Sequence, residues 1–292
     1  MSYEEDVSWR LPCGHAVLEK EQVHYCDYLS LVQLVSLMKP HAASVLDGSR
    51  APRDLGDPDE LQFIGIHQAF EIEFVVHADA LRRAITAVDA DHFDEATSLV
   101  GRAIKATKVY VALAAQLMTM PPKSFLRFRD LLLPVSSTES EGFRIVELLS
   151  GITPQSFYGT PFPEMPLLRY RQFLERPLGK DRGKMPSQWW TPRMSEVVQE
   201  RNLATSFLDA TARHGFTPRN ISQDCSLGLL ATALRSYESS FLGFRKIHLE
   251  MVIQQLGEVV PGLGNTSGAK FLESVIKNAR LFPFFDEKSA SS

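Results

Sequence analysis

Two histidines occupy positions where apolar side chains are expected. His67 lies in the stretch FIGIHQAFE, with Phe63 one turn before it. His248 lies in FLGFRKIHLEMVIQQLG, with Phe244 one turn before it. A neutral imidazole offers a nitrogen lone pair to a metal or a proton, and it titrates near neutral pH. Two such residues on two long helices are the minimum needed to hold a planar cofactor inside a helical bundle, one as a metal ligand and one at the opposite face.

A plainer interpretation competes with this one. Each histidine would then be a buried structural residue whose ring nitrogens are hydrogen bonded, and Glu71, one turn after His67, is placed to be such a partner. The spacing of the residues alone leaves both interpretations open.

Other metal and phosphate chemistries have weaker support. Cys13, His15, His24 and Cys26 would offer four ligands to a zinc ion, but their spacing matches no familiar finger pattern, and the alternative is an N-terminal arm with unrelated side chains. Di-iron bundles need two Glu-x-x-His motifs, and EQVH is the single match. The stretch GLGNTSG is glycine-rich, but no strand precedes it, so a phosphate-binding loop is not indicated.

The elements that must position these residues have a helical period. Apolar residues recur at three- and four-residue spacing, and Pro58 with Glu60 marks one helix start, where Asp57 is a candidate cap. No alternating β-branched run is long enough for a sheet. The pattern predicts helices over residues 57–85, 94–120, 123–133, 140–151, 194–215 and 223–257, and a short one near the C-terminus.

We therefore predict an all-α helical bundle in a single domain over residues 1–292, with an N-terminal arm at 1–20 and a tail at 286–292. The region around 152–192 is rich in Pro, Gly and aromatic residues, which predicts a loop-rich insert with one short helix at 164–175.

The bulk composition limits the class of protein. The 292 residues are 44% hydrophobic and 23% charged, with a formal charge of −4, so the chain is typical of a globular protein without a basic face. Nucleic acid and membrane surfaces are accordingly excluded as partners. Three scattered cysteines favour a reducing compartment, and MSYEEDVSWR has no apolar signal region. We expect a cytoplasmic protein.

Five blocks in order resemble the tryptophan 2,3-dioxygenase family of haem oxygenases, from about residue 25 to residue 272. The blocks are YCDYLSLVQLVSLMKP, DELQFIGIHQAFEIEF, MTMPPKSFLRFRDLLLPVSSTESEGFRIVE, YESSFLGFRKIHLEMVIQQLG and GLGNTSGAKFL. Their order is far more specific than any single motif. The resemblance implies a haem-dependent oxygenase with non-covalently bound haem b, a tryptophan-like substrate and O₂.

The resemblance also implies a role for each unusual residue. His248 would be the axial ligand of the haem iron. His67 would be the catalytic residue on the opposite side, near the indole N–H of the substrate. Phe63 and Phe244 would line the cofactor pocket. Arg144, in GFRIVE, would bind the substrate carboxylate, because a guanidinium offers two parallel hydrogen bonds. A surface ion pair with Glu147 is the alternative for Arg144.

The N-terminal helix and the glycine-rich loop complete the substrate site by the same resemblance. Tyr25, Tyr28 and Leu29 would reach the pocket of a neighbouring subunit, which implies a homotetramer, with a homodimer as the alternative. Leu263 and Thr266 would come from the loop that closes over the substrate. Ordinary packing of the tyrosines and a solvent-exposed loop are the corresponding alternatives.

The chain departs from the family pattern at the rim of this site. Leu263 stands where the family has a threonine that contacts the substrate, and a leucine makes no hydrogen bond to an ammonium or a carboxylate. Gly142 replaces a glutamine and Glu73 a tryptophan, and Thr138 and Glu139 replace a Phe-Gln pair. We expect an oxygenase of the same type with a changed substrate or outcome: either cleavage to N-formylkynurenine or mono-oxygenation to an oxindole or hydroxyindole. A non-catalytic haem sensor or carrier is the alternative outside the oxygenases.

Overall fold

The computed structural model describes residues 28–38, 58–129, 140–152, 197, 200–257 and 269–286. These residues are mostly helical and contain no β-strand, so the all-α prediction is confirmed for this part of the chain. In the same part of the chain, no helix is both long and apolar enough to cross a membrane. The chain groups into two compact units, and helix α4, Pro58–Asp89, contributes to both.

The smaller unit contains residues 1–68 and 120–132. Its described helices are α2, Leu31–Ser36, the beginning of α4, and α6, Pro122–Arg129. Pro58 opens α4, and Asp59 and Glu60 in the first turn complement the positive end of the helix dipole. The side-chain amide of Gln68 donates a hydrogen bond to the Leu37 carbonyl (3.2 Å), which links the end of α2 to α4.

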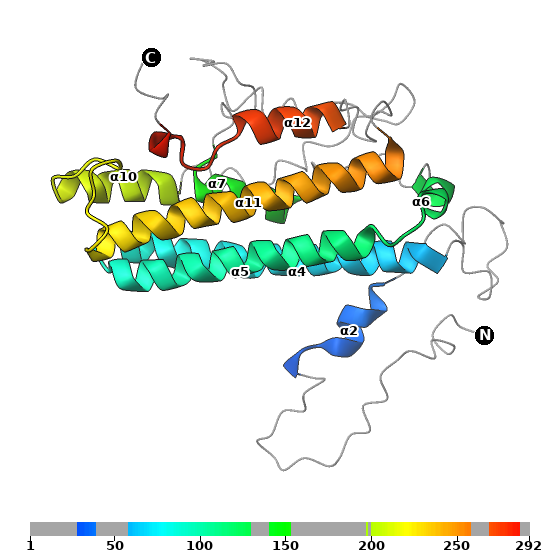
Figure 1. Ribbon diagram of the computed structural model, residues 1–292. Coiled ribbons are helices and arrows are strands. Elements are labelled where there is room, and N and C mark those ends of the chain that lie inside the picture. Colours follow the sequence, from blue (N-terminus) through cyan, green and yellow to red (C-terminus); the bar gives the residue numbers. More distant parts are fainter. Residues whose placement is uncertain are drawn as a thin grey trace, which may run out of the picture. The chain divides into compact units, whose positions relative to one another are not determined.

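The larger unit contains residues 69–119 and 133–292. The later part of α4 turns at residues 90–92 into α5, Phe93–Leu117, and α11, Ser226–Leu256, packs along α5 (Figure 1). The buried stripe of α5 follows the helical period, and its small alanine side chains let α11 approach closely. The residues of this stripe are Phe93, Ala96, Leu99, Val100, Ala103, Ala106, Thr107, Tyr110, Ala114 and Leu117.

Shorter helices surround this layer. They are α7, Glu141–Ser150, α10, Leu203–Arg213, α12, Ala269–Asn278, and the 3₁₀ turn η5, Pro283–Phe285. Helix α10 packs on α7, and α12 packs on α11. The Ser140 hydroxyl accepts a hydrogen bond from the Phe143 N–H and so caps α7. Gly151 ends α7 with a φ of 122°, a conformation that other residues rarely adopt.

The predicted helices agree with those found, with one correction. Residues 194–215 do not form one helix, because α10 begins only after Asn202, which forms a capping box with Thr205. Asp57, residues 130–139, the insert at 153–196 and the segment 258–268 lie outside the described residues. The single domain over 1–292, with its arm at 1–20 and tail at 286–292, stays a prediction.

Candidate functional site

His67 lies in the smaller unit, on α4. Its Nδ1 is 2.7 Å from the Phe63 carbonyl oxygen, which accepts a hydrogen bond, so Nδ1 carries the proton and Nε2 carries the lone pair. Burial lowers the pKa of the imidazole, and the hydrogen bond to Phe63 opposes this shift only partly. His67 is therefore neutral at physiological pH, with Nε2 as a hydrogen-bond acceptor.

An aromatic group surrounds His67 within this unit. The Phe63 ring lies 4.0 Å from the imidazole, measured between ring centroids, and it also contacts Phe125 (5.8 Å) and Phe128 (5.5 Å) on α6. The structure thus brings together two of the predicted site residues, Phe63 and His67, in an apolar setting.

His248 lies in the larger unit, on α11. It is half-buried, and its ring is nearly parallel to that of Phe244, with 6.0 Å between centroids and 8° between planes. Phe244 is itself packed against Tyr110 (5.2 Å) and Phe143 (5.7 Å). The prediction that His248 and Phe244 share one side of the helix agrees with this geometry.

These residues fit a haem. Because a porphyrin already holds the haem iron, the protein would need to supply only one histidine and an apolar wall. His248 beside Phe244 offers that donor set on a long helix. Among the described residues, no three His, Cys, Asp or Glu side chains gather as a site for a bare metal ion would require. The Cys13, His15, His24 and Cys26 set lies outside the described residues.

Arg144 is buried, and its partner is the one that the alternative interpretation named. Its Nη1 lies 2.6 Å from Glu147 Oε2, one turn later on α7. Glu147 is 1% exposed, so this is a pair in the interior and not the predicted surface pair. Helix α7 places Arg144 beside the Phe143 ring, 4.9 Å from the guanidinium carbon to the ring centroid.

A second arginine binds the same carboxylate. Arg245 Nη2 donates to Glu147 Oε1 at 2.9 Å, and its Nη1 donates to the Ala279 carbonyl. Burial lowers the pKa of the Arg245 guanidinium, and the Glu147 carboxylate opposes this shift. Guanidinium groups stay charged in proteins. The cluster of Arg144, Glu147 and Arg245 therefore has two positive charges and one negative charge, and we call it the α7–α11 cluster.

Sequence reasoning did not identify Arg245 as a site residue. It stands three positions before His248 and next to Phe244, so it shares a helix with the candidate ligand. The signal that was available is its charge inside the apolar stretch FLGFRKIH. Its partner, Glu147, is 98 residues away along the chain, and no local pattern connects them.

A third histidine, His77, was also missed. It is fully buried in the larger unit between two tyrosines: Nδ1 lies 2.6 Å from the Tyr110 hydroxyl and Nε2 lies 3.0 Å from the Tyr237 hydroxyl. Burial lowers the pKa of His77 to about 3, so it is neutral. It continues the stripe of Phe70 and Phe74 along α4, which is the sequence signal for it.

The protons of this network have one consistent arrangement. Ser150 donates its single proton to the Val146 carbonyl (2.7 Å), so the Tyr237 hydroxyl donates to Ser150 (2.7 Å). Tyr237 must then accept from His77 Nε2–H, and His77 Nδ1 accepts from Tyr110. Every member is satisfied, which is what makes a buried polar network stabilising. His77 is thus a structural histidine of the kind that the plainer interpretation assigned to His67 and His248.

The remaining predicted site residues are placed as follows. Tyr28 and Leu29 come just before α2 and are 76% and 40% exposed. Tyr25, Leu263 and Thr266 lie outside the described residues, as do Thr138 and Glu139.

Gly142 is packed too closely for a side chain. A Cβ at this position would lie 2.7 Å from the Glu71 carboxylate and 2.9 Å from Phe74 Cβ. The glycine therefore lets the start of α7 lie against α4 within the larger unit.

Comparison with known proteins gives one consistent family. The family model described as tryptophan 2,3-dioxygenase matches residues 11–160. The tryptophan 2,3-dioxygenase of Caulobacter vibrioides is 28% identical over 273 residues, covering 90% of this chain and 96% of the relative. That of Anaeromyxobacter dehalogenans is 26% identical and covers 86% and 90%, and that of Xanthomonas campestris pv. campestris is 26% identical and covers 96% and 91%.

Proposed function

The chain belongs to the tryptophan 2,3-dioxygenase family, and we propose that it is a haem-dependent oxygenase that acts with O₂ on the indole ring of tryptophan or a substituted tryptophan. The family assignment makes it an oxidoreductase with non-covalently bound haem b. The observation that carries the substrate assignment is the buried guanidinium of Arg144, which suits an amino acid carboxylate.

Haem, when bound, supplies the iron that activates O₂. His248 would hold the haem iron through its imidazole, because it lies on a long helix against the apolar ring of Phe244. Phe244 would give His248 an apolar wall, Phe63 would do the same for His67, and each ring would exclude water from its own histidine.

His67 is assigned to the indole N–H. The hydrogen bond from Nδ1 to the Phe63 carbonyl fixes the tautomer, so Nε2 is the atom that would accept a hydrogen bond or a proton from the substrate. The lowered pKa supports this role, since a protonated imidazole could not accept.

Arg144 is assigned to the substrate carboxylate, although it pairs with Glu147. A guanidinium carries five N–H donors in a fixed planar fork, a geometry that matches a carboxylate. A substrate carboxylate bound there would be held in a fixed orientation by charge-assisted hydrogen bonds. A gas sensor has no use for such a group, which favours an enzyme over a haem carrier.

A changed substrate or outcome is supported by the departures at the site rim. At Leu263, the chain lacks the threonine hydroxyl that contacts the substrate in the family pattern. At Gly142, it lacks the family's glutamine side chain, for which α4 leaves no room. We therefore include ring- or chain-substituted tryptophans and mono-oxygenation within the proposal, beside cleavage to N-formylkynurenine.

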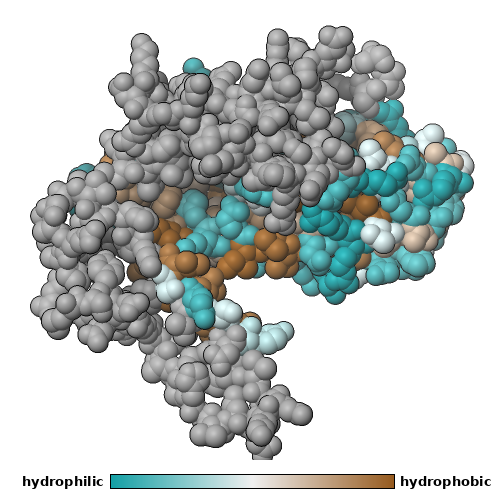
Figure 2. All heavy atoms as spheres, turned by 180° about the vertical axis from the view of Figure 1, so that it is seen from behind, coloured by the Kyte–Doolittle hydropathy of each residue, from teal (hydrophilic) through white to brown (hydrophobic). Residues whose placement is uncertain are grey.

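We further propose a homotetramer, or a homodimer, in the cytoplasm. Apolar side chains that a monomer would leave in water support this: Ile72, Val75 and Val76 on α4 are 47%, 59% and 57% exposed. Figure 2 shows hydrophobic side chains exposed on the face opposite to that seen in Figure 1. In the smaller unit, the Tyr28 side chain is likewise exposed, at 76%.

Paired histidine variants test the proposal. His248→Ala should abolish haem retention, measured by the Soret band of the purified protein, while His67→Ala should keep haem and lose most turnover of L-tryptophan. Replacement of the exposed His92 by alanine is the matched control and should change neither property. Full haem content in the His248 variant would overturn the ligand assignment. Unchanged turnover in the His67 variant would make His67 a structural residue.

A further inference from the structure

Two buried tyrosines share His77 but differ in what accepts their protons. Tyr110, Tyr237 and His77 are each 0% exposed, so bulk water reaches none of them. The Tyr110 hydroxyl donates to the lone pair of His77 Nδ1 at 2.6 Å, whereas the Tyr237 hydroxyl donates to the Ser150 hydroxyl at 2.7 Å. An imidazole nitrogen is a base, and an aliphatic hydroxyl is not. Of these two phenols, Tyr110 is therefore the one whose proton has a base to move to.

This difference decides which phenol is oxidised more easily. Loss of one electron makes a phenol a strong acid, so the electron leaves readily only where the proton can leave as well. Burial raises the pKa of both Tyr110 and Tyr237, so neither phenol ionises beforehand. Burial also lowers the pKa of His77 to about 3, but an oxidised phenol is a far stronger acid than the imidazolium. The proton of an oxidised Tyr110 therefore moves to Nδ1 along the existing hydrogen bond.

Ring contacts connect Tyr110 with His248 within the larger unit. The Tyr110 ring lies 5.2 Å from the Phe244 ring, edge to face, and the Phe244 ring lies 6.0 Å from the His248 imidazole, with 8° between planes. Tyr237 instead contacts Phe241 at 6.0 Å, and Phe241 contacts Phe244 at 6.5 Å. These distances join ring centroids. Along these contacts, one ring separates Tyr110 from the residue assigned to the haem iron, and two rings separate Tyr237 from it.

We propose that Tyr110 is a redox-active tyrosine, which gives one electron to the haem when hydrogen peroxide oxidises it, while His77 Nδ1 takes the phenol proton. This inference goes beyond oxygenation of the indole and rests on the proposed function, because it needs haem at His248. Hydrogen peroxide takes one electron from ferrous haem and one, through the haem, from Tyr110. With two protons from solvent, its O–O bond breaks and two water molecules leave. The haem is then ferric, Tyr110 is a neutral phenoxyl radical, and His77 is an imidazolium.

Electron paramagnetic resonance of the reduced, haem-loaded protein, frozen rapidly after mixing with an equimolar amount of hydrogen peroxide, tests the proposal. We expect a tyrosyl radical, whose hyperfine splitting narrows when the protein is produced with ring-deuterated tyrosine. Tyr110→Phe should lose this signal. Tyr237→Phe is the matched control and should keep it, because this change removes an equally buried hydroxyl from the same network.

A separate variant tests the base. His77→Gln keeps Tyr110 but replaces the imidazole with a far weaker base, so it should also lose the radical. This variant serves if Tyr110→Phe does not fold. A merely structural role for His77 predicts the opposite, namely that the radical persists in a His77 variant whose Soret band is intact.

Two failures are distinguishable. A wild-type protein that binds no haem, or a His248→Ala variant that keeps it, would overturn the ligand assignment and this inference with it. A haem-loaded wild type that shows no tyrosyl radical after peroxide, or that keeps the same radical after Tyr110→Phe, would overturn the inference alone.

Discussion

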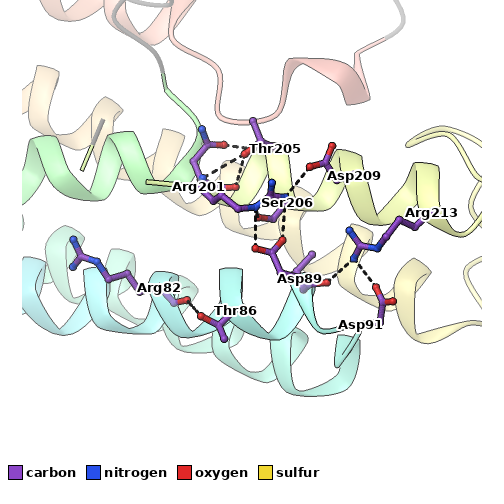
Figure 3. Close-up of polar contacts among 11 residues, drawn as sticks. Arg82, Thr86, Asp89, Asp91, Arg201, Thr205, Ser206, Asp209 and Arg213 are labelled. Carbon is purple, nitrogen blue, oxygen red and sulfur yellow. Dashed lines mark hydrogen bonds and ion pairs between the residues drawn. The ribbon is translucent and has the colours of Figure 1, made fainter. Parts of the chain in front are cut away.

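Two groups of arginines and carboxylates in the larger unit have different environments. One lies where α4 and α10 meet, and Figure 3 shows its side chains pointing toward one another across the two helices. Arg201 binds Asp89 (2.9 Å) and Asp209 (2.7 Å), and Arg213 binds Asp91 (2.6 Å). These side chains are about a third to a half exposed, and water solvates each of them.

The α7–α11 cluster has similar distances but almost no solvent. Its three side chains are 10%, 2% and 7% exposed. Exposed ion pairs contribute at most about 1 kcal/mol, whereas breaking a buried pair by removing one partner typically costs about 3–5 kcal/mol. Apolar residues would fill the same volume at a lower desolvation cost. The exposed group therefore links α4 to the start of α10 at a small desolvation cost, whereas the desolvation cost of the buried group indicates that it is kept for a function and not for stability alone.

The largest expected effect is on stability. Glu147→Ala leaves two buried guanidiniums without their shared carboxylate and should lower the free energy of unfolding by about 3–5 kcal/mol. Asp209→Ala in the exposed group should lower it by at most about 1 kcal/mol. Urea denaturation of both variants measures this contrast, and similar losses of unfolding free energy in the two would contradict the difference in environment described above.

The second effect is on substrate affinity. Arg144→Ala should raise KM for L-tryptophan by about 10- to 100-fold, because a hydrogen bond to a charged group contributes about 1.5–3 kcal/mol. The KM for tryptamine, which has no carboxylate, should change little. Arg201→Ala should change neither. Steady-state kinetics with both compounds test this, and equal changes for the two in the Arg144 variant would mean that it does not bind the carboxylate.

The third effect concerns pH. The pKa of His77 in the folded protein, about 3, lies below its ordinary value of 6.5, so the unfolded chain binds a proton that the folded protein does not. Stability is therefore complete above pH 6.5 and falls as the pH decreases toward 3, by at most about 1.4 kcal/mol per pH unit.

His77→Phe should remove this part of the pH dependence, which urea denaturation between pH 6.5 and 4.5 would show as a smaller slope than in the wild type. The same change at the exposed His92 is the control. An unchanged slope in the His77 variant would show that the buried imidazole is not the titrating group.

The fold was largely predictable because the apolar period continues through α4, α5 and α11. The start of α10 was not predicted, since MSEVVQERNLATSF keeps a helical period while the Asn202 and Thr205 capping box places the boundary inside it. The residues of the capping box are visible in the sequence, but the continuous helical period outweighed them in the prediction.

The site was predictable where the signal is local or where the family pattern supplies it. His67 and His248 stand out as imidazoles in apolar stripes, and the order of five blocks identified the family, which the comparisons confirm. The pairing of Arg144 with Glu147 was weighed, but its burial was not, because burial depends on α11. Arg245 was missed for the same reason: its partner belongs to another helix, and the sequence does not show which helices pack together.

The most direct measurement is mass spectrometry of the product formed by the haem-loaded, reduced protein under ¹⁸O₂ with L-tryptophan and a panel of substituted tryptophans. The proposal predicts at least one labelled oxygen atom in an indole-derived product, with two atoms identifying ring cleavage and one identifying mono-oxygenation. Unlabelled indoles throughout, from a protein with an intact Soret band, would contradict it and leave a haem-binding protein without oxygenase activity.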